Sequence, residues 1–386
     1  MSLRVLALSA SIALTVGLVP TAGIAQAKSV PVSIKGDSSE VHRIWGSDRV
    51  STAIFASRDM YPSATKEATG KPKTQVTHVI VAGADNPADS ATAIPLAVQT
   101  GAPILLTYNN ITKTNLHNSA SLHPYTREEI ERVLRPGGMV TIIGGVDAVS
   151  LEAEDQIKKM VGDRKQPLNF SVRRLGGDTR ALTSQRVSDT TAERNETNSM
   201  LTNPLKALDT YNVVTASINP SKVYAVDPSD ANWATALVAG NIAARNNGMV
   251  VYGSQGVAWA RQNLSGFRLV RLGTWNQNTW PSSVVPDESP AAVDPDVMSL
   301  YVDLGSTNQL AFATDKDFPD ALVGAAHAAQ RKRALVMTDG KAKAVPKEFL
   351  DTVRPFTSIS KKGGDIFYGG NQAFTASNAS KIAEGK

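Results

Sequence analysis

The chain has 386 residues, no cysteine and a formal net charge of +5 at pH 7. This length is too great for one ordinary hydrophobic core and suits two or three domains. The lack of cysteine excludes a disulfide framework, a cysteine nucleophile and a thiolate metal site. Lysine and arginine are dispersed rather than gathered in the dense tracts typical of nucleic-acid binding, so no nucleic-acid partner is expected.

The first residues have the pattern of a secretory signal peptide. Arg4 gives a positive start, residues 5–19 are apolar, and residues 25–27 (Ala-Gln-Ala) have the small side chains of a cleavage site. We therefore expect residues 1–27 to be removed on export and residues 28–42 to form a polar N-terminal arm. The remainder contains no apolar stretch long enough to span a bilayer, so the mature protein is expected to have no membrane segment.

The stretch 78–107 predicts a strand, a helix and a second strand. Residues 78–82 are a short β-branched run, residues 89–99 a small-residue helix, and residues 104–106 an apolar run without polar alternation. Gly101 follows the helix, at a place where glycine commonly ends one. A strand without polar alternation is covered on both faces, and a βαβ unit has parallel strands. The stretch therefore predicts the core of an α/β module.

The same unit occurs twice more, in residues 222–253 and 309–340. The start of the helix carries Asp89 in the first unit, Thr235 in the second and Asp320 in the third. Self-similarity at a recurring spacing is typical of repeat architectures. We therefore expect three α/β modules along the chain.

Shorter motifs flank each unit. A head with two arginines, residues 43–50, recurs as residues 174–181, and each head predicts a small strand, a glycine turn and the start of a helix. A closing strand that ends in two glycines, residues 139–145, recurs as residues 365–370. Residues 267–274 could close the second repeat or begin the third. We prefer the closing role because they follow a short helix, as the first closing strand does.

Together these motifs resemble the cell wall-binding repeat 2 family, whose modules usually come as three in tandem on exported proteins of Gram-positive bacteria. The resemblance rests on the arginine head, the Asp-containing helix start, the strand Pro103–Leu106 and the closing glycine pair. It implies an α/β fold of three tandem Toprim-like or Rossmann-like modules with parallel sheets in a pseudo-threefold arrangement. The repeats would span residues 43–172, 173–274 and 275–386, and the third has a degenerate head without an intact G-x-D-R motif.

Two sets of residues are candidates for binding the polymer that the resemblance implies. Arginine offers a forked donor to phosphate or carboxylate, so the heads could receive an anionic polymer. The same arginines could instead pair with aspartates and fix the packing of the modules. The strand reads as core on physical grounds, whereas the resemblance gives its end a binding role, at the carboxyl ends of parallel strands. The candidates are Arg43, Asp48, Arg49, Arg174, Asp178, Arg180, Pro103, Ile104, Leu105 and Leu106.

The residues at the helix starts are expected to be structural. Asp89 and Asp320, with Thr235 in the second repeat, would stand at helix N-termini, where a carboxylate accepts backbone N–H groups and meets the positive end of the dipole. Thr126 and Glu129 have the spacing of a capping box ahead of another short helix.

The expected function is non-catalytic. The resemblance implies non-covalent retention on an anionic secondary wall polymer, teichoic-acid-like or a similar glycopolymer, at the cell surface after cleavage near Ala27. No catalytic residue, metal or cofactor is expected. The alternatives are an exported metal-dependent hydrolase of wall polymer that uses Asp89 and Asp320, and a structural surface-layer protein. The identity of the polymer and any self-association stay open.

Overall fold

The computed structural model describes fourteen stretches of the chain in detail. They are residues 32–33, 40–62, 75–85, 90–109, 121–160, 170–177, 183, 185–187, 220–227, 233–273, 288–291, 309–354, 365–370 and 373–384. The expected signal peptide and most of the expected N-terminal arm lie outside these residues. All statements below concern the described residues.

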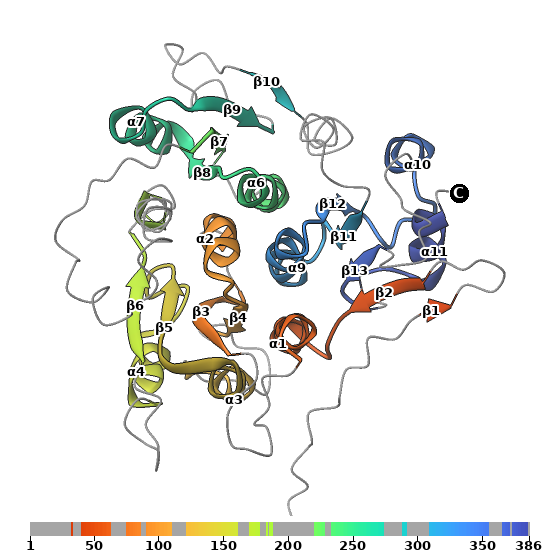
Figure 1. The fold of residues 1–386 in the computed structure, drawn as a ribbon. Coiled ribbons are helices and arrows are strands. Elements are labelled where there is room, and N and C mark those ends of the chain that lie inside the picture. Colours follow the sequence, from red (N-terminus) through yellow and green to blue (C-terminus); the bar gives the residue numbers. More distant parts are fainter. Residues whose placement is uncertain are drawn as a thin grey trace, which may run out of the picture.

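The protein is an α/β protein with three small sheets (Figure 1). The first sheet has the order β4 (Ile104–Thr107), β3 (Val76–Gly83), β5 (Leu134–Ile143) and β6 (Ser171–Leu175), and all its pairs are parallel. The second has the order β8 (Met249–Tyr252), β7 (Lys222–Val226), β9 (Arg268–Leu272) and β10 (Glu288–Ala291), again all parallel.

The third sheet repeats this order and adds one strand. Its parallel strands are β12 (Ala334–Thr338), β11 (Leu310–Thr314), β13 (Ile366–Tyr368) and β2 (Glu40–Ile44), and the short β1 (Val32–Ser33) pairs antiparallel with β2. In each sheet the closing strand, which is β5, β9 or β13, therefore lies between the first strand of a βαβ unit and one further strand. The α/β class with parallel sheets is confirmed; the pseudo-threefold arrangement and the Toprim-like or Rossmann-like modules stay predictions.

The strand that pairs with the far side of the closing strand in each sheet comes from a different repeat than the closing strand and the βαβ unit. The strand of the second head, β6, completes the first sheet, and β10 completes the second. The strand of the first head, β2, completes the third sheet by pairing with β13, in the register Arg43 with Phe367. Each sheet thus contains strands from two of the expected repeats, and the strand of the N-terminal head completes the third sheet.

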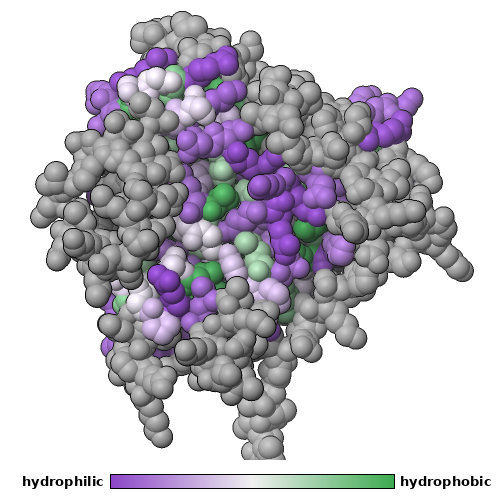
Figure 2. All heavy atoms as spheres, in the orientation of Figure 1, coloured by the Kyte–Doolittle hydropathy of each residue, from purple (hydrophilic) through white to green (hydrophobic). Residues whose placement is uncertain are grey.

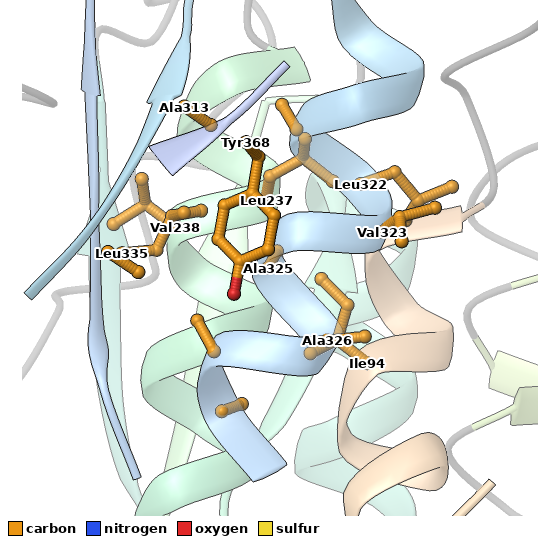
Figure 3. Close-up of a cluster of buried hydrophobic side chains, with 14 of the residues drawn as sticks. Ile94, Leu237, Val238, Ala313, Leu322, Val323, Ala325, Ala326, Leu335 and Tyr368 are labelled. Carbon is orange, nitrogen blue, oxygen red and sulfur yellow. The ribbon is translucent and has the colours of Figure 1, made fainter. Parts of the chain in front are cut away.

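One helix from each unit packs at the centre of the molecule. These helices are α2 (Ala93–Thr100), α6 (Trp233–Arg245) and α9 (Phe318–Gln330), and each packs against the other two. Figure 3 shows their side chains interdigitating with those of the third sheet, including Ile94, Leu237, Leu322 and Tyr368. Gly240 permits the closest approach, because a Cβ there would lie 2.6 Å from the carbonyl oxygen of Ala91.

Other helices cover the outer faces of the sheets. The first sheet is covered by α3 (Pro124–Val133) and α4 (Leu151–Met160), and the second by α7 (Gly253–Asn263). The third is covered by α10 (Lys347–Val353) and α11 (Ala376–Glu384). Because helices lie on both faces, β4, β8 and β12 are buried along their whole length, as their apolar sequences predict.

The helix of the first head, α1 (Arg49–Met60), joins the first and third sheets. It packs on α9, β4 and α3 (Figure 1). At its end, Asp59 accepts hydrogen bonds from the Arg331 side chain at 2.6 Å and shares a 3.1 Å contact with His327. Gln330 donates to the carbonyl oxygens of Ala97 and Ala102 at 3.0 and 2.8 Å, which ties α9 to α2. These hydrogen bonds therefore help to fix the relative positions of the two sheets.

Two local expectations need comment. The strand β9 occupies the closing position, since it pairs with β7 as β5 pairs with β3, so residues 267–274 close the second sheet. The expected capping box is wrong: α3 begins at Pro124 and its N-cap residue is His123. Thr126 instead donates to the carbonyl oxygen of Leu106, and Glu129 accepts from Arg132, because both side chains face neighbouring elements rather than the helix start.

The surface is mostly hydrophilic where it is described. Figure 2 shows one face, on which hydrophobic residues form only small separate spots. Three large hydrophobic side chains are exposed among the described residues: Trp45, Val146 and Leu151. Within the described parts of the chain, no helix is long and apolar enough to cross a membrane.

Candidate functional site

The first and third sheets meet where their strands end, at the start of α1. Asp85 lies two residues after β3, Tyr108 follows β4 directly, and Asp317 lies between β11 and α9. The head supplies Asp48 and Arg49. We call these five residues the junction site. Carboxyl ends of parallel strands are the usual place for ligands in α/β proteins, which makes this the candidate site.

The head loop fixes the position of the two charged head residues. The N–H of Gly46 donates to the Thr52 hydroxyl at 3.0 Å, and the Asp48 carboxylate accepts from the Ser51 N–H at 2.7 Å. Asp48 is thus the N-cap of α1, an interaction of about 1 kcal/mol. The second head repeats the loop, since the Gly177 N–H donates to the Thr183 hydroxyl at 2.9 Å.

Arg49 bridges the two sheets. Its Nη1 donates to the carbonyl oxygen of Ala84 at 2.8 Å and lies 3.4 Å from a carboxylate oxygen of Asp85. Its Nη2 lies 3.8 Å from Asp317. The guanidinium is therefore shared between the end of β3 and the start of α9. The contacts of Arg49 with Asp85 and Asp317 fit the alternative in which this arginine fixes the packing of the modules, and its role in polymer binding stays a prediction.

The electrostatics of the junction site are dominated by carboxylates. Burial raises the pKa of Asp85 despite the nearby Arg49 and a 3.3 Å hydrogen bond from the Asn109 N–H. Burial, with the negative charges of Asp48, Asp85 and Asp317 acting against Arg49, raises the pKa of Tyr108 to about 12. Three carboxylates thus face one guanidinium, and the neighbourhood disfavours further negative charge.

Asp320 lies beneath the junction site, in the first turn of α9. Its side chain is buried, 9% exposed, and burial raises its pKa to about 6 while a hydrogen bond with Thr52 lowers it. Among the described atoms, its Oδ1 has no hydrogen-bond partner. Asp320 thus lies at the helix N-terminus as expected, while Asp317 is the N-cap residue and the Asp320 carboxylate bonds to Thr52 of α1.

The outer arginine of each head braces the head strand against the loop after the closing strand. Arg43 is buried and donates to the carbonyl oxygen of Phe374 at 3.3 Å, and desolvation lowers its pKa. Arg174 donates to the carbonyl oxygens of Gly144 and Gly145 at 3.0 and 2.9 Å and to Glu154 at 2.7 Å. Both arginines are thus engaged in internal contacts rather than directed to a ligand. Asp178 and Arg180 lie outside the described residues.

The strand that the resemblance gave a binding role is interior. Ile104, Leu105 and Leu106 are at most 3% exposed, and Pro103 is buried as well. Leu105 packs into the outer cluster of the first sheet, whereas Ile104 and Leu106 face the central helices. These side chains are therefore shielded from solvent in this arrangement, and a binding role for them stays a prediction. The strand reaches the surface only at its end, through Tyr108 and Asn109.

The equivalent helix start in the second unit is neutral. Thr235 is buried in the first turn of α6, and a Cβ on Gly273, which follows β9, would lie 3.0 Å from its methyl group. In the third unit, a Cβ on Gly369, which follows β13, would likewise lie 3.0 Å from the Oδ2 of Asp320. Asp89 lies outside the described residues. In the described part of the chain, no group of three histidine, aspartate or glutamate side chains could hold a metal ion.

The sequence pattern does not identify three of the five residues of the junction site. No sequence motif contains Asp85, Tyr108 or Asp317. The sequence indicates them only by their position shortly after a strand of a βαβ unit. Because parallel strands end at the same edge, residues in that position come together. The pairing of the first head with the third unit, which brings Asp317 to Arg49, has no local signal.

Two solved structures share this α/β fold. Cwp6 from Clostridium difficile superimposes with a TM-score of 0.63 at 19% identity, over 93% of this chain and 50% of that one. Cwp8 from the same organism gives a TM-score of 0.63 at 19% identity, over 89% of this chain and 51% of that one. These likenesses concern the fold.

Sequence comparison places the first repeat in a family. Residues 43–154 match the family model of cell wall binding domain 2 (CWB2), and the resemblance to the cell wall-binding repeat 2 family is thereby confirmed for this segment. The chain is also 26% identical over 313 residues to the N-acetylmuramoyl-L-alanine amidase LytC of Bacillus subtilis (strain 168), over 81% of this chain and 52% of that protein. The chain spans about half the length of each of these relatives.

Proposed function

We propose that this protein is an exported, non-catalytic wall-binding protein that is retained non-covalently on a secondary polymer of the cell wall. The observation that carries the proposal is the match of residues 43–154 to cell wall binding domain 2. The three completed sheets support it, because they extend the same construction over the rest of the described chain. The binding surface would lie at the carboxyl ends of the strands, where the junction site is placed.

The polymer is proposed to be anionic. The net charge of +5 suits a partner with dispersed negative charge. Contacts of this kind are screened by salt over a Debye length of about 8 Å at physiological ionic strength. Retention on isolated walls should therefore weaken steeply between low salt and 1 M salt.

The test is a pull-down of the mature chain on walls with and without their secondary polymers. Binding that disappears when the polymer is extracted and that weakens with salt supports the proposal. Equal binding to both wall preparations would overturn it, because the peptidoglycan itself would then be the ligand. Retention that is the same at low and high salt would overturn only its electrostatic part.

A hydrolase is the second candidate, and the observation that favours it is the relative named as an amidase. In that reading Asp89 and Asp320 would bind a divalent metal and act on wall polymer. Asp320 is buried, and the described residues around it offer no set of three metal ligands. Metal-dependent release of wall fragments by the purified protein would favour this candidate over the first. A structural surface-layer role predicts that neither binding to extracted polymer nor turnover is observed.

A further inference from the structure

The charge balance of the junction site is opposite to what an anion site requires. Arg49 is the one cation of the site, and its guanidinium already contacts a backbone carbonyl and two carboxylates. A phosphate or uronate placed there would meet Asp48, Asp85 and Asp317 as well as Arg49. Like charges at such short separations repel one another, so the three carboxylates oppose the binding of an anion.

The same groups suit a ligand that carries hydrogen-bond donors. Carboxylates only accept hydrogen bonds, and bonds to charged acceptors are the stronger kind. The Asp85 and Asp317 side chains are 38% and 44% exposed, so both can accept from a molecule in solution. Tyr108 is half-buried beside them and offers an aromatic ring with one polar end. An aromatic ring flanked by carboxylates matches a sugar residue with hydroxyl or ammonium groups.

A second, independent observation comes from Asp320. Its carboxylate is nine-tenths buried, interacts with Asp48, Arg49 and Asp317 of the junction site, and has an Oδ1 with no partner among the described atoms. Buried polar atoms are nearly always paired. This acceptor, which lies next to the junction site, has no donor among the described protein atoms. This adds a further acceptor to a site that already has an excess of them.

We propose that the junction site binds a sugar residue of the wall polymer through the hydroxyl or ammonium donors of that residue, and that the anionic groups of the polymer lie elsewhere. The proposal rests on the proposed wall binding and names the chemistry of one contact. Asp85 and Asp317 accept the donors, Tyr108 lies against the sugar, and Arg49 holds the two carboxylates in place across the sheets.

The decisive variants are Asp85→Asn and Asp317→Asn, because the two ligand chemistries predict opposite signs. If the site binds donors, each variant loses a charged acceptor and binds walls roughly threefold to tenfold more weakly. If the site binds an anion, each variant removes a repulsion and binds more tightly. Asp155→Asn is the matched control, since Asp155 is an exposed aspartate paired with Lys159 on α4, outside the site. The ion pairs of Arg49 are partly exposed, and such pairs contribute little to stability, so the variants should fold.

Direct titration with single sugars tests the site without the wall. Glucosamine, N-acetylglucosamine and glucuronic acid are added to the mature chain, and chemical shifts are followed by NMR in the wild type and in Asp85→Asn. A response to glucosamine alone identifies ammonium as the donor, and equal responses to glucosamine and N-acetylglucosamine identify hydroxyl groups. A dominant response to glucuronic acid, or tighter wall binding by the two variants, overturns the inference while wall binding stands. Absence of wall binding by the wild type would instead overturn the proposed function, and the titration would still decide the inference.

Discussion

The first and third sheets have the same strand order but are completed from opposite directions along the chain. In the first sheet, β6 comes from the next repeat and pairs with β5, in the register Ile143 with Leu175. In the third sheet, β2 comes from the far end of the chain and pairs with β13, in the register Ile44 with Tyr368. The pairing in the first sheet connects repeats that are adjacent in sequence, whereas the pairing in the third sheet connects the two ends of the described chain.

The difference means that the third sheet depends on the N-terminus, although its other strands lie in the last part of the sequence. Arg49 then extends this dependence to the candidate site, because it lies on α1 and contacts both Asp85 and Asp317. The entropic cost of bringing two chain segments together grows only slowly with the number of residues between them, so such an arrangement is thermodynamically accessible. The molecule is therefore expected to behave as one unit rather than as three separable repeats.

The largest effect is expected from removing residues 1–62, which deletes β2 and α1. The deletion takes away Ile44, Val50 and Ile54, which are at most 6% exposed. Each contributes about 1.5–3 kcal/mol, so the loss of about 5 kcal/mol or more is comparable with the whole stability of a typical protein. We expect the third sheet, encoded more than two hundred residues away, to lose protection in hydrogen exchange. Removing only residues 1–39 is the control and should leave the protection nearly unchanged; equal protection after both deletions would show that the sheet does not need its head strand.

A slightly smaller effect is expected from breaking the first sheet at Leu105. Leu105 is 0% exposed, and an aspartate there would be a buried charge without a partner, at a cost of several kcal/mol. Leu105→Asp should therefore fail to give a folded protein. Leu151→Asp is the matched control, since Leu151 is 64% exposed, and its stability should change by no more than about 0.5 kcal/mol. A Leu105→Asp variant with normal circular dichroism that merely fails to bind walls would mean that this strand is a ligand surface.

The third sheet also has a buried acid that the first lacks. Asp365 precedes β13, its Oδ1 accepts from the Leu310 N–H at 3.1 Å, and burial raises its pKa to about 7. Ile366 pairs with Ala311 in the third sheet as Thr141 pairs with Ile80 in the first. The residue before Thr141, Val140, is therefore the counterpart of Asp365, and it cannot titrate. The third sheet should therefore be sensitive to pH where the first is not.

The sign follows from the direction of the shift. With an ordinary pKa of about 3.9 in the unfolded chain, Asp365 holds its proton more tightly in the folded state, so stability is lost as pH rises from about 4 to about 7. Asp365→Asn keeps the acceptor for Leu310 and removes this loss. Its stability relative to the wild type should rise across that window by about 2–4 kcal/mol. Urea unfolding at several pH values measures the difference, in which other titrating groups cancel. Asp351→Asn, at an exposed ion pair with Arg354, is the control, and parallel curves for Asp365→Asn and the wild type would contradict the shift.

The sequence predicts the local elements well and the long-range pairing poorly. The expected strands 78–82 and 104–106 lie within β3 and β4. The strand part of the expected closing segment, which begins at Met139, forms the second half of β5. Apolar runs between glycines carry that information, because the burial of both faces forces every position to be apolar. The sequence predicts a closing strand that begins only at Met139, yet β5 begins at Leu134. Pro136, Gly137 and Gly138 lie within the strand, where the register with β3 shifts.

The completion of the third sheet could not be predicted from local patterns. The head residues Arg43 and Ile44 indicate a strand but not its partner, since hydrogen-bonding edges of parallel strands are alike and neighbouring strands usually pair in sequence order. The candidate site depends on that partner. Arg49 was recognised as important, but Asp317 as its counterpart follows only from the structure. The head of the third repeat was judged degenerate, and β10 nevertheless occupies its position in the second sheet.

The smallest effect concerns the ends of the three central helices, which are built alike from different residues. Gly101, Asn247 and Lys332 have φ of 61°, 53° and 57°. In each case the next N–H bonds back to a helix carbonyl, from Ala102 to Ala97 at 2.9 Å, from Gly248 to Ala243 at 2.8 Å and from Arg333 to Ala328 at 2.7 Å. This is the left-handed helix end that glycine adopts without strain, whereas a side chain costs about 1 kcal/mol.

Lys332→Gly should therefore stabilise the third unit, and Gly101→Lys should destabilise the first by a similar amount of about 0.5–1 kcal/mol. Lys332 is exposed, so its replacement removes no buried contact, and the gain comes from the backbone alone. The flexibility that glycine adds to the unfolded chain opposes the gain, which is why the expected change is small. Thermal unfolding of both variants measures it as shifts of opposite sign. A Lys332→Gly variant that melts below the wild type would show that the lysine side chain contributes more to this helix end than its strained φ takes away.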